Sequence, residues 1–353
     1  MREWNLWAIR IILAFVVTGT VQTVWADRVD LGFGEVDVER AFVAGHPNGI
    51  PPDSPANYVD PNVASSPFAG VGSLRIISDN TFICSGTVIS PNHVLTAAHC
   101  LDLNDDGVVD VTPGDVDFFL NAGSSPSVTI PARKFSIHPD FTGFGNPVVN
   151  DDVAVIKLSQ PVPLGTPVYP LYVSVPNFTT PITMVGYGRS GNGVDGHTVD
   201  PNFHVKRTGR NILDAKSIDD EDSSSIEVFM FDFDGPDATT NIFDVGTPGF
   251  DQFVEGTLGN ALESTIGGGD SGGPSFVDVG NESLELLGIN TFTFSLVGGP
   301  AAPLFGSGGG GMLVPPYLNF IQGLIVMPLP AAGWMGLGLL GAIATVRRLG
   351  RNV

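Results

Sequence analysis

Short apolar runs rich in β-branched residues, separated by turn residues, dominate the chain from residue 67 onward. Several of them alternate apolar and polar positions, as strands with one buried face do. The predicted strands are 72–77, 82–89, 93–96, 117–121, 128–130, 152–158, 181–186, 226–231 and 286–294. Tyr317, Phe320, Ile321 and Leu324 then recur at helical spacing, which predicts one short C-terminal helix. The pattern as a whole indicates an all-β protein.

Three stretches interrupt this pattern. Residues 195–222 and 235–257 are polar and acidic, which favours long surface loops, and 306–311 is a run dominated by glycine. Residues 27–66 are rich in Pro, Gly, Asp and Asn and show little periodicity, so we interpret them as a leader or propeptide.

The N-terminus has the layout of an export signal. Arg2 and Arg10 lie before a mostly apolar run at residues 11–21. Val24-Trp25-Ala26 then supplies the small residues of a signal-peptidase cleavage site. This predicts a signal peptide over residues 1–26. An uncleaved anchor is the alternative, although the apolar run is shorter than the ~20 residues that span a bilayer. Export permits a disulfide.

The C-terminus carries a second apolar segment. Met327-Pro328-Leu329-Pro330 is followed by uncharged residues over 331–346 and then by Arg347, Arg348 and Arg351, which predicts a transmembrane helix. Residues 327–353 resemble the PEP-CTERM sorting signal of Gram-negative bacteria, with Leu329 where the family name has Glu. The resemblance implies export across the inner membrane to the cell surface or beyond, and processing by exosortase-like machinery. A permanent single-span anchor is the alternative.

The charge balance narrows the choice of partners. The chain has 16 Lys+Arg against 37 Asp+Glu, a formal net charge of -21. Such an excess of negative charge repels the phosphate backbone, so no nucleic-acid partner is expected. The two cysteines are too few for a zinc site of four thiolates but could form one disulfide.

Three separated segments hold the residue types that acyl transfer requires. They are Thr96-Ala97-Ala98-His99-Cys100, the alternating run that begins with Asp151-Asp152-Val153-Ala154-Val155, and Gly269-Asp270-Ser271-Gly272-Gly273-Pro274. A serine hydroxyl needs a base to remove its proton, and a carboxylate can hold the imidazole of that base in the useful tautomer. Glycines around the serine let a substrate carbonyl approach the backbone.

In this order, the segments resemble the trypsin-like (chymotrypsin-fold) serine proteases over residues 67–326. The resemblance implies two six-stranded antiparallel β-barrels, His99 as base, Asp152 as its orienting acid and Ser271 as nucleophile. It also implies an oxyanion hole from the N–H groups of Gly269 and Ser271. Cys84 and Cys100 stand where the family has a disulfide, with two free thiols as the alternative.

Two departures from the family concern specificity and activation. Thr265 occupies the position of the trypsin pocket aspartate, and Thr291 and Thr293 align with the pocket wall, which implies a narrowed, neutral pocket. No basic-Ile-Val-Gly-Gly segment precedes the domain, and Asn57-Tyr58-Val59-Asp60 is the nearest stretch. The family pairs a new N-terminus with the aspartate before the serine, which is Asp270 here. Either another group binds the Asp270 carboxylate, or a maturation cleavage of the chain occurs at another site.

One loop could bind a metal ion. Asp102, Asn104, Asp106 and Asp110 have the spacing of calcium ligands around Gly107, but Pro113 replaces the final glutamate. Structural calcium and a metal-free acidic turn both fit this pattern. The chemistry itself requires no cofactor.

The sequence thus predicts a secreted serine endopeptidase that acts on protein or peptide substrates through an acyl-enzyme. The alternative is a surface or matrix protein that keeps the protease fold only for binding. Intact triad residues and oxyanion glycines weigh against this alternative.

Overall fold

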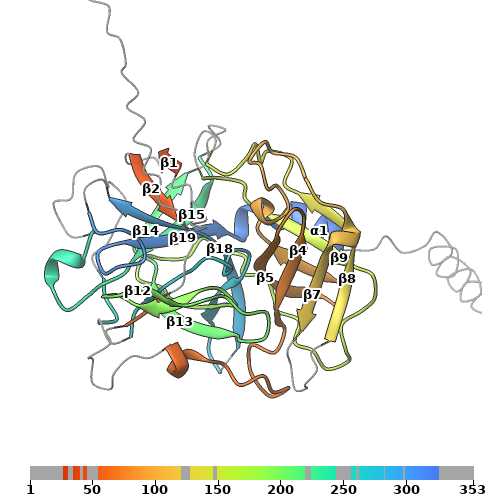
Figure 1. The fold of residues 1–353 in the computed structure, drawn as a ribbon, viewed down its shortest axis with the longest axis horizontal. Coiled ribbons are helices and arrows are strands. Elements are labelled where there is room, and N and C mark those ends of the chain that lie inside the picture. The colour runs from red at the N-terminus through yellow and green to blue at the C-terminus, as the bar shows by residue number, and fades with distance from the viewer. Residues whose placement is uncertain are drawn as a thin grey trace, which may run out of the picture.

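The fold has two β-rich halves, which lie side by side in Figure 1. The computed structural model describes residues 27–30, 35–39, 43–45, 55–120, 128–145, 149–218, 224–243, 256–259, 262–281, 283–296 and 299–325. The expected signal peptide (1–26) and sorting signal (327–353) lie outside these residues. No helix within the described part of the chain is long and apolar enough to cross a bilayer.

The first half is a closed barrel of six antiparallel strands. They are β4 (Val71–Ile77), β5 (Thr81–Ser90), β6 (His93–Thr96), β7 (Val116–Leu120), β8 (Val128–Ile137) and β9 (Ala154–Leu158), paired in the order β4-β5-β6-β9-β8-β7. The alternation in β7 buries Val116, Phe118 and Leu120 inside the barrel. The pattern of apolar positions therefore predicts both the strands and their inward faces.

The second half is an antiparallel sheet whose main path has the order β13-β10-β17-β18-β19-β15-β14. Its strands are β10 (Pro181–Gly186), β13 (Arg207–Ile212), β14 (Ala215–Ile218), β15 (Ile226–Asp232), β17 (Pro274–Asp278), β18 (Leu284–Leu296) and β19 (Gly308–Leu313). The all-β prediction with a six-stranded barrel is confirmed for the first half, and the second sheet has one strand more on its main path than the six expected.

Shorter elements connect and extend these two units. The strands are β1 (Asp27–Asp30), β2 (Glu35–Glu39), β3 (Val43–Ala44), β11 (Ser190–Asn192), β12 (Gly196–Val199) and β16 (Ser264–Thr265). The helices are η1 (Pro55–Tyr58), η2 (Ala98–Cys100), η3 (Pro113–Asp115), η4 (Ala238–Thr240), η5 (Pro315–Tyr317) and α1 (Leu318–Ile325). The predicted C-terminal helix is thus confirmed as α1. Tyr317 of η5 and Phe320 of α1 make ring contacts with His138, and these contacts fasten the last described segment to the first barrel.

The prediction that residues 195–222 form a surface loop was wrong, and the glycine run, for which no element was predicted, forms a strand. The stretch 195–222 contains β12, β13 and β14, whose polar residues are partly buried, as Asn211 shows by bonding to two backbone carbonyls. The glycine run contains β19, where a Cβ on Gly308 would meet the ring of Phe294 and one on Gly310 would meet the ring of Phe292. The aromatic rings therefore leave no room for side chains in β19. Glycine forms this strand for that reason, although glycine is usually disfavoured in strands.

The segment before the first barrel is attached to the second sheet. β3 pairs with β16, and Val59 bridges to Arg207. Lys206, which is fully buried, donates to the carbonyl of Phe68 at 2.7 Å and forms an ion pair with Asp60 at 2.9 Å. Residues 55–66 are thereby held in place by a buried charge pair.

Candidate active site

His99 and Asp152 are brought together by the pairing of β6 with β9. Thr96 lies opposite Ala154 in this pair, so the turn after β6 and the turn before β9 meet at one end of the barrel. The backbone N–H of His99 donates to Asp152 Oδ1 at 2.8 Å, and His99 Nδ1 lies 2.6 Å from Oδ2. Both side chains are buried. This double contact fixes the plane of the imidazole and leaves Nε2 at its opposite edge.

The neighbouring Asp151 has a different partner. Its backbone has a φ of +53°, and its Oδ1 lies 2.9 Å from Nδ1 of His138. The left-handed turn at Asp151 thus directs two adjacent carboxylates to two different histidines.

Ser271 lies in the turn between β16 and β17. Its carbonyl accepts the N–H of Ser85 at 2.8 Å, and the N–H of Gly272 donates to the carbonyl of Asn290 at 2.8 Å. Gly272 has a φ of +79°, and a Cβ there would overlap the Thr96 hydroxyl and lie 2.5 Å from the Ser85 carbonyl oxygen. The serine turn is therefore packed directly against the segment that leads to His99.

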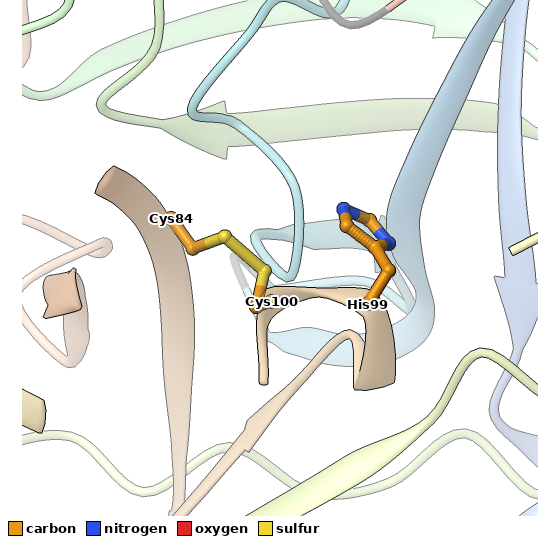
Figure 2. A group of neighbouring side chains, drawn as sticks. All are labelled: Cys84, His99 and Cys100. Carbon is orange, nitrogen blue, oxygen red and sulfur yellow. A yellow bond between two sulfur atoms is a disulfide. The ribbon is translucent and has the colours of Figure 1, made fainter. Parts of the chain in front are cut away.

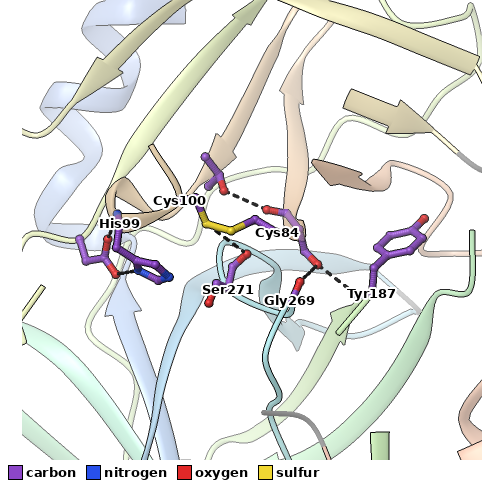
Figure 3. Close-up of a disulfide and its surroundings, with 9 residues drawn as sticks. Cys84, His99, Cys100, Tyr187, Gly269 and Ser271 are labelled. Carbon is purple, nitrogen blue, oxygen red and sulfur yellow. Dashed lines mark hydrogen bonds and ion pairs between the residues drawn. A yellow bond between two sulfur atoms is a disulfide. The ribbon is translucent and has the colours of Figure 1, made fainter. Parts of the chain in front are cut away.

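The side chains of Ser271 and His99 point toward one another in Figure 3. His99 Nε2 is buried and has no hydrogen-bond partner among the described residues. A buried ring nitrogen without a partner is costly unless it serves another purpose. The arrangement leaves this nitrogen available to a hydroxyl proton.

The turn also presents backbone donors. The N–H groups of Asp270, Gly272 and Gly273 all have carbonyl acceptors, whereas those of Gly269 and Ser271 have none within the part of the chain that the structure describes. Gly269 has a φ of +105°, which an L side chain rarely adopts. Two N–H groups from one turn are thus left to bind a negatively charged oxygen.

Asp270 holds this turn from inside the protein. Its carboxylate accepts the N–H groups of Gly188 and Gly267, each at 2.8 Å. Burial raises the pKa of Asp270 to about 7, against the lowering effect of these two bonds and of the Arg207 charge. Asp60, in the stretch nearest to an activation motif, pairs with Lys206 instead. Two backbone amides are therefore the groups that satisfy Asp270.

A disulfide anchors the histidine turn. Cys84 in β5 and Cys100 in η2 are joined, with Cα atoms 6.3 Å apart. In Figure 2 the imidazole of His99 projects from the short turn to a different side than the Cys100 sulfur. These three side chains lie close enough to share a metal ion, but a disulfide provides no thiolate ligand.

Comparison with known proteins points in the same direction. The family model described as Trypsin matches residues 62–226, a range that includes His99 and Asp152 and ends before Ser271. The venom serine protease Bi-VSP of Bombus ignitus is 38% identical over 92 residues, which are 26% of this chain and 24% of that protein. Brachyurin of Leptuca pugilator is 38% identical over 86 residues, or 24% of this chain and 35% of its own length.

Chymotrypsin-C of Bos taurus is 35% identical over 94 residues, which cover 26% of this chain and 33% of that protein. The chain thus spans about a quarter to a third of the length of these relatives. Residues 62–226 are therefore similar to the trypsin family of serine proteases.

The three threonines that the sequence resemblance assigned to a specificity pocket, Thr265, Thr291 and Thr293, are all buried. Thr293 in β18 lies opposite Gly309 in β19, and a Cβ on Gly309 would lie 3.1 Å from Thr265 Oγ1. Thr265 and Thr293 are therefore close to the same glycine. Thr291 lies two residues earlier in β18 and its hydroxyl donates to the Ile289 carbonyl at 3.3 Å.

The acidic loop at residues 102–110 is closed by its own hydrogen bonds. Asp102 accepts the N–H groups of Asp106 and Gly107, and Asp110 accepts those of Leu103 and Asn104. No described group of side chains close enough to share an ion includes these carboxylates. These bonds close the loop within the chain and use oxygens of both Asp102 and Asp110.

Sequence reasoning missed a second set of carboxylates in the second half of the fold. Asp214, Asp232, Asp234 and Glu263 are buried together in the second half. Their only signal is an acidic residue at alternate positions at the end of a strand, in Asp232-Phe233-Asp234. The distance along the chain to Glu263 hides the cluster from a sequence pattern.

Proposed function

We propose that the protein is a serine endopeptidase that hydrolyses peptide bonds through an acyl-enzyme. The observation that carries the proposal is the buried His99–Asp152 pair, whose partnerless Nε2 is directed toward Ser271. A structural histidine would be expected to use both ring nitrogens.

In the proposed reaction, Ser271 Oγ forms a bond to the scissile carbonyl carbon while its proton passes to His99 Nε2. The carbonyl oxygen becomes an oxyanion, which the N–H groups of Gly269 and Ser271 stabilise; one such donor is typically worth about 2.7–4 kcal/mol. The Nε2 proton then passes to the amine as the C–N bond breaks. Water repeats the sequence to release the acid and free Ser271. Asp152 keeps Nδ1 protonated throughout.

Substrate preference follows from the absence of charge at the pocket positions. Thr265, Thr291 and Thr293 offer no carboxylate to an Arg or Lys side chain. Glu263 is near in sequence, but its carboxylate accepts bonds from the N–H groups of Asp234 and Leu258 and from Thr257 Oγ1. We therefore propose protein or peptide substrates with small or medium neutral residues before the scissile bond.

The leader, residues 27–66, is proposed to cover the peptide-binding edge. On one edge of β18, β17 pairs only as far as Ile289, and β2 pairs with the same edge from Thr293 to Leu296. The other edge of β18 pairs with β19. Ser271 lies three residues before β17. An extended peptide that reaches Ser271 by strand addition would need this edge, so β2 competes with it.

Export and surface sorting through residues 1–26 and 327–353 belong to the same proposal, with exosortase-like machinery as the processing partner. A calcium ion at Asp102, Asn104, Asp106 and Asp110 is not required by this mechanism, which uses side chains and backbone amides alone.

A peptide panel tests the function. Protein without residues 27–39 should hydrolyse peptides with Ala or Val before the scissile bond faster than those with Arg or Lys, and Ser271→Ala should abolish this activity. Ser283→Ala, which changes an exposed serine, is the matched control. Hydrolysis that survives Ser271→Ala contradicts the proposal, and folded protein that cleaves no peptide supports the binding-only alternative.

A further inference from the structure

Arg207 and Asp270 lie on the same face of a strand pair in the second half. Arg207 begins β13 and lies directly opposite Gly186 of β10. Side chains directly opposite in an antiparallel pair lie on one face, with Cβ positions about 5 Å apart. The Asp270 carboxylate lies on this face too, because a Cβ on Gly186 would come 2.0 Å from Asp270 Oδ1. Gly186 therefore contributes no side chain between the guanidinium and the carboxylate.

Both side chains are buried. Arg207 is 7% exposed and Asp270 is 1% exposed. The segment before the first barrel covers Arg207, whose backbone bridges to Val59 and whose Nε donates to the Pro55 carbonyl at 3.4 Å. Arg207 Nη1 is fully buried and has no hydrogen-bond partner among the described residues. A buried cation with an unused donor is costly unless a negative group compensates its charge.

The negative group that acts on Arg207 is Asp270. Burial lowers the pKa of Arg207, and the charge of Asp270 raises it. The adjacent Lys206 pairs with Asp60 at 2.9 Å instead. None of the ion pairs among the described residues includes Arg207 or Asp270, so these two charges act on one another without direct contact.

We propose that Arg207 is a positioning residue of the serine turn, because its charge favours the ionised form of Asp270. An ionised carboxylate accepts hydrogen bonds more strongly than a neutral one, so it holds the turn more firmly through its two backbone amides. Asp270 stands between Gly269 and Ser271, the two donors of the proposed oxyanion hole. The compensating charge belongs to the folded chain itself, and no cleavage is needed to supply it. The effect on catalysis rests on the proposed function, whereas the coupling of the two charges does not.

A double-mutant cycle in the full-length protein tests this coupling without an assay of activity. At pH 8, Arg207→Gln should lower the urea midpoint of wild type at least about twice as much as that of Asp270→Asn. At pH 5 the two losses should be equal, because the pKa of Asp270 is raised to about 7 and the carboxyl holds its proton. Among the described residues, Arg207 is the charged group that shifts the pKa of Asp270, so the change with pH reports this pair.

Arg210→Gln is the matched control, because Arg210 lies in the same strand but is exposed. Arg210→Gln should change the midpoint equally in wild type and in Asp270→Asn. Arg207→Lys should retain most of the coupling, since it keeps the charge. Equal losses from Arg207→Gln in the two backgrounds at pH 8 would overturn the proposal.

Fluorophosphonate labelling of Ser271 in the full-length protein tests the positioning role. At pH 8, Arg207→Gln should take the label on the order of tenfold more slowly than wild type, and Arg207→Lys within about threefold of wild type. In peptide hydrolysis the loss should appear in kcat with KM unchanged, because the turn binds the oxyanion rather than the rest of the peptide.

The two readouts separate failure of this inference from failure of the proposed function. Coupled charges with unchanged labelling and unchanged kcat in Arg207→Gln would overturn the positioning role. Coupled charges in a wild type that takes no label and hydrolyses no peptide would support the Arg207–Asp270 pair and contradict the proposed peptidase.

Discussion

Replacing Gly272 by alanine tests how tightly the serine turn must fit the histidine segment. A Cβ at this position would lie 2.5 Å from the Ser85 carbonyl oxygen and would overlap the Thr96 hydroxyl. Cβ atoms in proteins essentially never approach within 3.0 Å, so Ser85 and the turn must separate by at least 0.5 Å. Thr96 Oγ1 donates to the same Ser85 carbonyl, so rotating it away costs that bond.

This separation should displace the nucleophile, because the Ser85 N–H holds the Ser271 carbonyl at 2.8 Å. Displacements near 1 Å at a reacting atom cost on the order of 10²-fold in rate. The structure requires at least half of such a displacement, so we expect Gly272→Ala to lower kcat on the order of tenfold or more. The assay is steady-state peptide hydrolysis, with the folded fraction established by urea unfolding.

Gly280→Ala is the matched control. Gly280 also has a positive φ, +103°, but a Cβ there would have no atom within 4 Å. Both variants bear the backbone strain of a left-handed alanine, about 1–2 kcal/mol, and only Gly272→Ala adds the collision. If folded Gly272→Ala kept a kcat within threefold of that of Gly280→Ala, the account of the serine turn would be refuted.

Three further predictions concern the triad, pH and the leader. Asp152→Asn should lower kcat for peptide hydrolysis about 10⁴-fold, because the imidazole of His99 would adopt the wrong tautomer. Asp151→Asn should lower kcat less than tenfold, because Asp151 contacts His138 instead. A larger loss in Asp151→Asn than in Asp152→Asn would mean that Asp151 is the acid that orients His99. The raised pKa of Asp270 means that the folded state binds its proton more tightly, so this contribution to stability is complete below pH ~4 and is lost as the pH rises through about 7. Between pH 4 and 8, the free energy of unfolding of wild type, measured with urea, should therefore fall by up to about 4 kcal/mol more than that of Asp270→Asn. Parallel pH profiles of the two proteins would contradict the raised pKa of Asp270. Removing residues 27–39 should lower KM about tenfold with kcat unchanged if β2 covers the edge nine-tenths of the time, and an unchanged KM would remove β2 from the substrate edge.

The first barrel could be predicted from the sequence because its strands keep the signals that strands share. Buried apolar residues alternate with partly exposed ones in the stretch that forms β7, and turn residues separate β5 from β6. The second sheet was harder to predict. β19 is a glycine strand packed against the aromatic rings of its neighbours. β13 buries Asn211, whose side chain donates to the carbonyls of Asp232 and Ser264. Both depend on distant partners that a local pattern does not contain.

The candidate site was predictable where residue type carries the chemistry. His99, Asp152 and Ser271 stand in recognisable segments, but the reason Asp151 differs from Asp152 lies in its positive φ and its contact with His138. The acidic loop at Asp102 shows the opposite case. Its spacing suits calcium, yet each carboxylate is used to close the turn. Hydrogen bonds that compete for the same oxygens are invisible in the spacing of the ligands.

Covalent labelling of Ser271 by a fluorophosphonate probe tests the central claim most directly. The probe reacts only with a serine whose proton is removed by a neighbouring base and whose oxyanion is stabilised. Mass spectrometry of protein without residues 27–39 should locate one adduct on Ser271, with no adduct in Ser271→Ala and strongly slowed labelling in His99→Ala. Folded protein that takes no label, or takes it on another serine, would contradict the account.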